Sequence, residues 1–162
     1  MIDEIDAKIV SILQNDARVA NAEIARQLGM APSGILERIR KLESRGIIQS
    51  YEAHINPRSV QLGLLAFVFI RADERLISNE TGEQLAAIPE VLEVHHITGE
   101  DCYLVKVRVA DTEALGRLLR EQFGSLPAVV STRTTIVLTT LKESTALPLT
   151  HLLEDTSNDH RS

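Results

Sequence analysis

Residues 20–46 read ANAEIARQLGMAPSGILERIRKLESRG, and their apolar spacing predicts two short helices joined by a tight turn. The first helix is expected at residues 22–28, with the Asn21 side chain capping its free backbone N–H groups. Gly29 suits the left-handed residue that ends a helix. Pro32 suits the first turn of the next helix, where its missing N–H costs nothing. The stretch therefore predicts a helix-turn-helix unit.

The second helix of this unit has an apolar side and a polar side. Its expected buried stripe is Ile35, Leu36, Ile39 and Leu42. Its expected outer side is Ser33, Gly34, Glu37, Arg38 and Lys41, with Arg40 and Arg45 at the flanks. Apolar stripes alone are typical of any small helical domain. The basic outer side and the short turn are what favour nucleic-acid binding.

The flanking residues extend this unit in both directions. Asp3 is expected to open a helix whose apolar face packs over the pair and completes a three-helix core. Residues 47–55 read IIQSYEAHI, alternate weakly and predict a short strand, or wing. Together these features predict a winged helix-turn-helix domain over residues 1–55. In such a domain the N-terminal residues of the second helix meet base edges in the major groove.

The charge is unevenly distributed along the chain. The 162 residues carry 17 basic and 23 acidic side chains, a net charge of −6. Residues 1–60 hold eight of each sign, so the acidic excess lies in residues 61–162. Residues 26–45 hold five basic and two acidic residues, a local charge of +3. So modest a patch predicts weak binding by one copy and useful affinity only for two or more.

The composition also sets the expected compartment. The single cysteine, Cys102, excludes an internal disulfide framework and fits a reducing cytosol. No apolar run approaches the roughly 20 residues of a membrane span. The chain begins MIDEID, which is not a basic and apolar leader. We therefore expect a cytoplasmic protein with no membrane partner.

The pattern changes after a linker at residues 56–63. Strands are expected at residues 64–72, 91–97, 102–110 and 128–141, and helices at residues 80–88 and 112–123. The order βαββαβ, with IPEV at residues 88–91 echoed by LPAV at residues 126–129, predicts a ferredoxin-like domain. The expected fold class is therefore α+β, with this second domain at residues 64–149 and a flexible tail at residues 150–162.

One face of this expected sheet has no helix to cover it. In the third strand Tyr103, Val105, Val107 and Val109 face one way, and Cys102, Leu104, Lys106 and Arg108 face the other. In residues 64–70 both faces are apolar. An apolar strand on the open side needs a cover, most simply a second copy of the domain. We therefore expect a homodimer, which presents two DNA-reading helices to a pseudo-palindromic site.

Four separated stretches together resemble the Lrp/AsnC (feast/famine) transcription regulators, over about residues 2–149. They are IDEIDAKIVSILQNDAR, LERIRKLESRGIIQSYEAHINP, ITGEDCYLVKVRVAD, and LPAVVSTRTTIVL followed by LPL. The resemblance implies a DNA-binding domain, then an effector and oligomerisation domain. It also implies double-stranded DNA and usually a small amino acid as partners, and dimers that often assemble into octamers. No enzymatic activity and no cofactor are expected.

The resemblance also carries DNA-binding positions onto this chain. They are Ser33, Gly34, Glu37, Arg38, Arg40 and Lys41, on the DNA-facing helix. Arg38 and Lys41 are expected to contact bases or phosphates, two roles that one sequence does not separate. Glu37 can instead pair with Lys41 at the i,i+4 spacing, and Arg26 and Arg45 can be solvated surface charges.

The implied effector pocket lies near the loop between the second and third strands. Its candidate residues are Thr98, Gly99, Glu100, Asp101, Cys102 and Tyr103, with Thr132 and Thr134 on the last strand. Glu100 or Asp101 can hold the ammonium of an amino acid, and backbone N–H groups at the Gly99 turn can hold its carboxylate. Apart from the resemblance, an acidic loop with a glycine is an ordinary hairpin turn.

The chain departs from the pattern of this family at two positions. Many relatives have an aspartate where this chain has Cys102, so the identity of the effector stays open. Many also have a serine where this chain has Ala31, before the proline that opens the second helix. The missing cap should cost about 1 kcal/mol of helix stability.

Other chemistry finds little support in the sequence. His95 and His96 are adjacent on a strand and point to opposite faces, so no metal site is expected. Neither a phosphate-binding glycine loop nor a nucleophile motif occurs, so no catalytic residue is assigned. One alternative is a sirohaem decarboxylase-like enzyme on the same two-domain scaffold, using His95, His96 and Arg133. Another is an amino-acid sensor that binds other proteins.

Overall fold

The computed structural model describes residues 2–73 and 79–153, which fall into two compact units. Within the described residues, the first unit combines residues 2–54 with residues 143–153, and the second comprises residues 55–73 and 79–142. Residues 143–149 had been expected in the second domain, but they belong to the first unit. Residues 154–162 of the expected tail lie outside the described residues, and residues 150–153 form a short helix, α6 (Thr150–Leu153).

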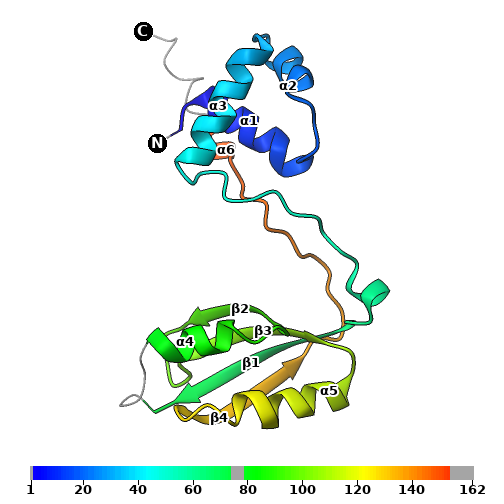
Figure 1. Ribbon diagram of the computed structural model, residues 1–162, viewed down its shortest axis with the longest axis vertical. Helices are drawn as coiled ribbons and strands as arrows, with labels where there is room; N and C mark the ends of the chain where they lie inside the picture. Colours follow the sequence, from blue (N-terminus) through cyan, green and yellow to red (C-terminus); the bar gives the residue numbers. More distant parts are fainter. Residues whose placement is uncertain (1, 74–78, 154–162) are drawn as a thin grey trace. The chain divides into compact units, whose positions relative to one another are not determined.

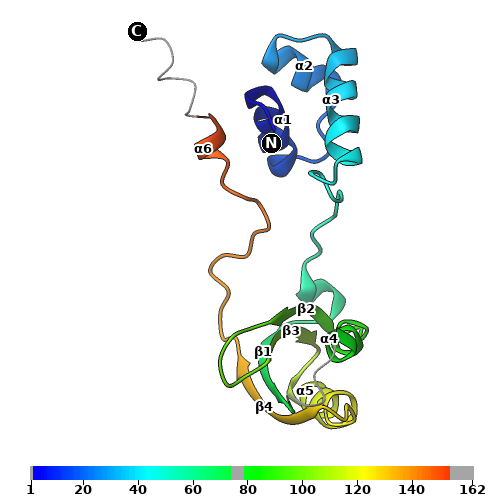
Figure 2. The same cartoon turned by 90° about the vertical axis from the view of Figure 1, so that its left-hand side faces the viewer.

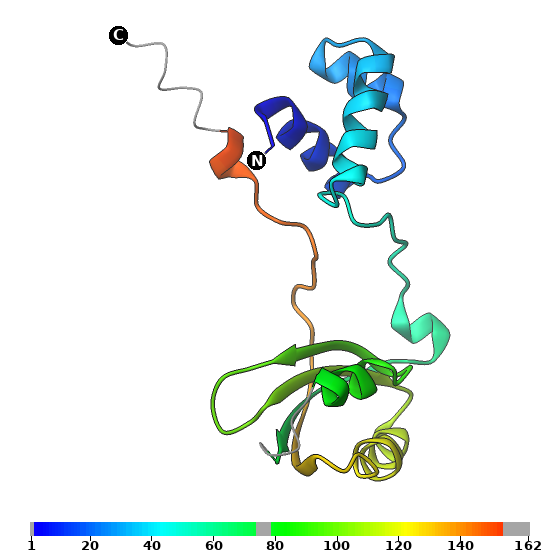
Figure 3. The ribbon, with the colours of Figure 1, turned by 60° about the vertical axis from the view of Figure 1, so that its left-hand side comes forward.

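Three helices build the core of the first unit (Figure 3). They are α1 (Glu4–Asn15), α2 (Asn21–Leu28) and α3 (Pro32–Ser44). Ile9, Ile24 and Ile35 are fully buried between them, which confirms the predicted three-helix core. The expected cap from Asn21 is wrong, because the helix already begins at Asn21. Its capping position is Ala20, which has no side-chain acceptor.

The turn between α2 and α3 is built as the sequence predicts. Gly29 has φ 64°, in the left-handed region that favours glycine, and the Met30 N–H bonds the Ala25 carbonyl oxygen at 2.9 Å. Pro32 is the first residue of α3. Ala31 caps α3 with an extended backbone and no side-chain hydrogen bond, as its identity predicts.

The expected wing is not a strand. Residues 49–56 have no regular secondary structure. The N–H groups of Ile47 and Ile48 both bond the Leu42 carbonyl oxygen, at 2.9 and 3.2 Å, and both side chains pack on the helical core. These backbone donors therefore complete the end of α3. The sheet formed by the described residues takes all its strands from the second unit.

The second unit is a four-stranded antiparallel sheet in the order β2-β3-β1-β4 (Figure 1). Its elements are η1 (Pro57–Val60), β1 (Leu64–Ala72), α4 (Asn79–Ala86), β2 (Val91–His96), β3 (Tyr103–Val109), α5 (Thr112–Arg117), the π-helical turn η2 (Leu118–Phe123) and β4 (Val129–Ile136). This is the predicted ferredoxin-like βαββαβ arrangement. Strand β4 is shorter than expected. The Val137 N–H still bonds the Leu65 carbonyl oxygen. Beyond that bond β4 has almost no backbone partner on β1, because β1 begins at Leu64.

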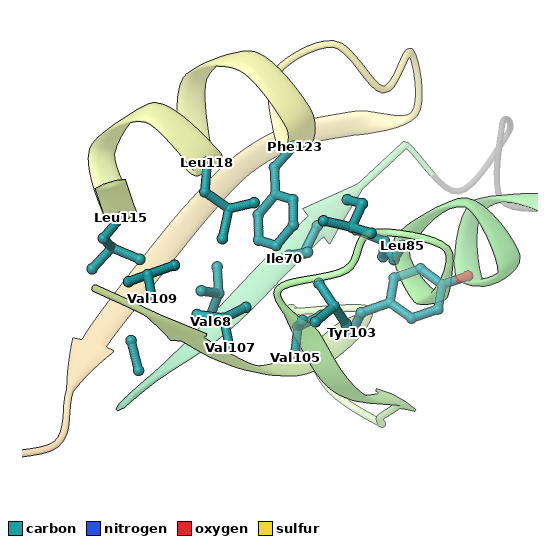
Figure 4. Close-up of a cluster of buried hydrophobic side chains, with 13 residues drawn as sticks. Val68, Ile70, Leu85, Tyr103, Val105, Val107, Val109, Leu115, Leu118 and Phe123 are labelled. Carbon is teal, nitrogen blue, oxygen red and sulfur yellow. The ribbon is translucent and has the colours of Figure 1, made fainter. Parts of the chain in front are cut away.

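Both helices of this unit lie on one side of the sheet (Figure 2). The core between them and the sheet is drawn in Figure 4. It contains Val68 and Ile70 from β1, Tyr103, Val105, Val107 and Val109 from β3, and Leu85, Leu115, Leu118 and Phe123 from the helical side. The predicted alternation in β3 is confirmed. No helix within the described residues is long and apolar enough to cross a membrane.

Candidate nucleic-acid interface and effector site

The exposed face of α3 is a narrow polar stripe. Ser33, Glu37, Arg40 and Lys41 are exposed, and they follow one another at helical spacings along one side. Gly34 is half-buried. Leu36 was expected in the core, but its residue is 37% exposed. Ile35, Ile39 and Leu42 supply the buried stripe, and Leu36 lies about 90° around the helix from the centre of that stripe.

Arg38 does not lie on this exposed face, contrary to expectation. Its Nη1 donates to Asp3 Oδ2 and to Asp6 Oδ1, both at 2.7 Å, so its side chain turns toward α1. The Arg38 side chain is 30% exposed and that of Asp6 is 11% exposed. Helical geometry explains this position, because Arg38 is only about 60° around the helix from the centre of the buried stripe.

The ion pairs shift the pKa values of the groups involved. A hydrogen bond from the Asp6 backbone N–H, followed by that from Arg38, holds the pKa of the Asp3 carboxyl below its usual range. The two carboxylates, Asp3 first, raise the pKa of the Arg38 guanidinium. Arg38 therefore stays charged, with that charge compensated locally.

A second cation of the predicted basic patch is also paired. Arg26 of α2 donates to both carboxylate oxygens of Glu23, at 2.9 and 2.6 Å. This pair, helped by Gln27, lowers the pKa of Glu23 to about 2. The basic character of the exposed α3 face therefore comes from Arg40 and Lys41, which lie beside Glu37.

The loop between β2 and β3 borders a cavity of about 760 Å³. Its lining residues are Arg71, Ala72, Asp73, Gly99, Glu100, Cys102 and Val130. The Cys102 N–H bonds the Ile70 carbonyl oxygen at 2.8 Å, which ties the loop to the end of β1. Residues of both charge signs line the cavity, Arg71 on one hand and Asp73 and Glu100 on the other. Such a lining suits a zwitterion.

The cavity gathers only part of the expected effector set. It includes Gly99, Glu100 and Cys102, whereas Thr98, Asp101, Tyr103, Thr132 and Thr134 do not line it. Asp101 is paired with Arg133 at 2.9 Å. Tyr103 is 4% exposed and belongs to the core. Thr132 and Thr134 pair with core residues of β1.

Besides Ala72 and Val130, two charged lining residues, Arg71 and Asp73, were not expected from the sequence. They lie about thirty residues before the loop and reach it only through the pairing of β1 with β3. The signal that could have found them is the end of the first predicted strand. In a ferredoxin-like sheet that end lies beside the start of the third strand.

The two histidines lie on opposite faces of β2, as predicted. His95 Nε2 lies 3.2 Å from Glu93 Oε2, and the His96 ring stacks on Tyr103 with centroids 5.2 Å apart. The His95 contact, ahead of that from Lys106, lowers the pKa of Glu93. Among residues 2–73 and 79–153, no cluster of three His, Cys, Asp or Glu side chains could hold a metal ion.

The sheet face opposite the helices is partly apolar. Leu65, Phe67 and Phe69 of β1 lie on it, opposite Arg108, Lys106 and Leu104 of β3. The Arg133 guanidinium lies over the Phe69 ring, 4.1 Å from its centroid. Phe67 and Phe69 stay half-exposed, so this face retains accessible aromatic surface.

A helix-turn-helix unit joined to a ferredoxin-like unit defines a two-domain DNA-binding regulator. A profile of the AsnC-type helix-turn-helix domain matches residues 2–43, and one of the Lrp/AsnC ligand binding domain matches residues 65–147. The chain belongs to the Lrp/AsnC family of transcriptional regulators. The resemblance noted in the sequence is thereby confirmed.

Relatives cover almost the whole chain. The HTH-type transcriptional regulator FL11 of Pyrococcus horikoshii is 42% identical over 148 residues, 91% of this chain and 97% of the relative. A regulator from Neisseria meningitidis, solved as a complex with L-Met, has a TM-score of 0.87 and 32% identity, covering 94% of this chain and 100% of that one.

A third relative is the feast or famine regulatory protein of Mycobacterium tuberculosis, complexed with L-methionine. It has a TM-score of 0.84 and 35% identity, covering 91% of this chain and 99% of that one. The sirohaem decarboxylase-like alternative finds no support in these comparisons.

Proposed function

We propose that this regulator binds DNA as a homodimer through α3, and that a small amino acid at the β2–β3 loop controls its assembly or its DNA binding. The observation that carries the proposal is the polar stripe of Ser33, Glu37, Arg40 and Lys41 on α3. Its N-terminal part would meet base edges, as in other helix-turn-helix proteins. The proposal places the protein in the cytoplasm, because its DNA target is there.

Dimer formation is supported by the open face of the sheet. Phe67 and Phe69 keep exposed aromatic surface there, and a second copy of the same face can cover it. A dimer also answers the electrostatic weakness of one unit, because two linked sites bind far more tightly than one. Assembly of dimers into octamers rests on family membership.

An amino-acid effector is supported by the charged cavity at the loop. Glu100 and Arg71, two lining residues of opposite charge, offer complements to both charged groups of an amino acid. Val130 and Cys102 add a less polar wall. The two relatives solved with L-methionine make methionine the first ligand to test. Bound effector would favour whichever assembly state holds it more tightly.

The DNA-binding part is tested by a mobility-shift assay on the DNA upstream of the protein's own gene, with Arg40→Ala and Lys41→Ala. Each variant should bind more weakly. For each lost phosphate contact, the slope of log K against log salt should fall by about 0.9. The matched control is Arg117→Ala, which removes an exposed cation of the second unit. It should change neither the affinity for DNA nor the salt slope. Unchanged binding in both α3 variants would refute this reading face.

The effector part is tested by adding each of the twenty amino acids to the same assay and to calorimetry. Glu100→Gln should weaken the response to every active amino acid, because the variant lacks a charge for the ammonium group. Glu113→Gln, an exposed glutamate on α5, is the matched control. An unaltered response in Glu100→Gln would remove this carboxylate from the site.

A further inference from the structure

One guanidinium joins the reading helix to the start of α1. Asp3 uses one carboxylate oxygen to cap α1, accepting from the Asp6 N–H at 2.7 Å, and the other to accept from Arg38. Asp6 accepts from the same Arg38 nitrogen. Asp6 is 8% exposed, and among the described residues only Thr81 joins it as a buried polar residue. The cluster is therefore built into the fold.

The apolar core sets which side of α3 is buried, and directional contacts define the rotation of the helix more finely. Ile35, Ile39 and Leu42 are aliphatic, and their contacts have little directional preference. Charge-assisted hydrogen bonds are directional and strong by comparison. Glu37, Arg38 and Lys41 belong to the same helix. Holding Arg38 in one direction therefore holds the rotation of α3, and with it the side from which Glu37 and Lys41 project.

We propose that Arg38 is a positioning residue, whose ion pairs with Asp3 and Asp6 set the orientation of the α3 reading face. Arg38 then acts on DNA recognition through α1 and does not contact the duplex itself. This inference rests on the proposed reading function of α3. It gives the two aspartates, which carry the wrong charge for DNA contact, a role in sequence recognition.

Removing the carboxylates of Asp3 and Asp6 should lower the affinity for the specific DNA site, which is the opposite of what charge alone predicts. Asp3→Asn/Asp6→Asn removes two negative charges from the DNA-binding unit. The side-chain size is kept, and asparagine is as good an N-cap as aspartate. Electrostatics alone predicts tighter binding to any duplex. Loss of positioning predicts weaker binding to the specific site, by roughly tenfold, the size of one lost base contact.

The experiment measures full-length protein on the upstream DNA site and on a scrambled duplex of equal length, by fluorescence anisotropy over a range of salt. We expect the double variant to lose affinity for the specific site only, with an unchanged salt slope. The matched control is Asp16→Asn/Glu52→Gln, which neutralises two exposed carboxylates of the same unit. It should leave the ratio of specific to nonspecific affinity intact.

A double-mutant cycle then separates positioning from contact. Arg38→Met should lower the specificity ratio in the native background and have little effect in the double-asparagine background, because the same network is already broken. Equal losses in both backgrounds, with a salt slope reduced by about 0.9, would show direct phosphate contact and overturn the inference. An unchanged specificity ratio in the double-asparagine protein would also overturn it.

Two measurements exclude loss of folding as the cause of a change in binding. Circular dichroism and thermal unfolding check that each variant is folded. If the double variant is not, Asp6→Asn alone is used, with the same expected loss of specificity and the same refuting result. If the native protein binds no upstream DNA specifically, the proposed function fails. If it binds and the variants keep its specificity, only the positioning role fails.

Discussion

Replacing Ala31 by serine should stabilise α3, the helix proposed to read DNA. Ala31 occupies the N-cap of α3 with φ −71° and ψ 142°, an extended conformation that a capping serine adopts without strain. The side chain now offers no acceptor to the first turn. A serine hydroxyl there can accept from the backbone N–H of Ser33 or Gly34.

The size of the effect follows from the cap alone. Exchanging alanine for serine at an N-cap is worth about 1 kcal/mol. For a cooperative unit of 60–100 residues, that corresponds to a rise in Tm of about 4–8 °C. The measurement is calorimetric unfolding of the full-length protein, following the transition of the first unit. Urea unfolding should show a higher midpoint with an unchanged m value.

Two matched substitutions make this prediction specific. Ala20 caps α2 with nearly the same backbone, φ −70° and ψ 143°, and Glu23 stands three residues on, so Ala20→Ser should stabilise the unit similarly. Ala22→Ser lies inside the first turn of α2 and should destabilise it by a few tenths of a kcal/mol. If Ala31→Ser gave no gain while Ala20→Ser did, the α3 cap described above would be wrong.

Four further outcomes follow from the structure. Gly99→Ala should cost about 1–3 kcal/mol of stability, because Gly99 has φ 117°, and should abolish the calorimetric response to any amino acid that binds at the proposed effector site; a retained response would place the ligand elsewhere. Phe67→Glu should give a smaller particle in light scattering by disrupting the proposed open-face dimer, and an unchanged mass would exclude that interface. Burial, then a hydrogen bond to a nearby glutamate, raises the pKa of Tyr51 to about 12 from its ordinary 10.0. The stability this gives is present below pH 10 and lost as pH rises through 12, so Tyr51→Phe should flatten alkaline unfolding curves over that window. Gln14→Ala removes two hydrogen bonds to the Leu147 backbone, at 3.1 and 2.7 Å, and should speed amide exchange at that residue; unchanged exchange would mean that the contact contributes nothing.

Much of the fold could be predicted from periodicity because burial sets it. Strand β1 was expected at residues 64–72 and is found there, since its apolar run is bounded by Gly63 and a polar segment. Details that depend on a shift of one residue were harder to predict from the sequence. The N-cap of α2 is Ala20 and not the expected Asn21, because a helix start is fixed by backbone angles that composition does not reveal.

The candidate site was less predictable, for two physical reasons. The exposed face of α3 depends on angle around the helix, and counting polar residues put Arg38 outside when its position is closer to the buried stripe. The cavity at the β2–β3 loop depends on strand register, which brings Arg71 and Asp73 to Gly99 and Glu100. Sequence neighbours such as Asp101 and Tyr103 are drawn elsewhere, to an ion pair and to the core.

The ion pairs of Arg26 and Arg38 reduce the number of cations that can contribute to DNA affinity. A count of charges gives +3 over residues 26–45, but Arg26 is paired with Glu23, and Arg38 is paired with Asp3 and Asp6. Arg40 and Lys41 on the exposed face of α3 can supply about two phosphate contacts for each unit, a salt slope near −2. So small a term gives each unit little nonspecific affinity. Occupancy of a promoter must then depend steeply on how many units bind together, because each added unit acts at high effective concentration. A ligand that shifts assembly would therefore control DNA binding without touching the reading helix. If the proposed function holds, regulation would therefore act through the effector unit, unlike in a protein with a strongly basic reading domain.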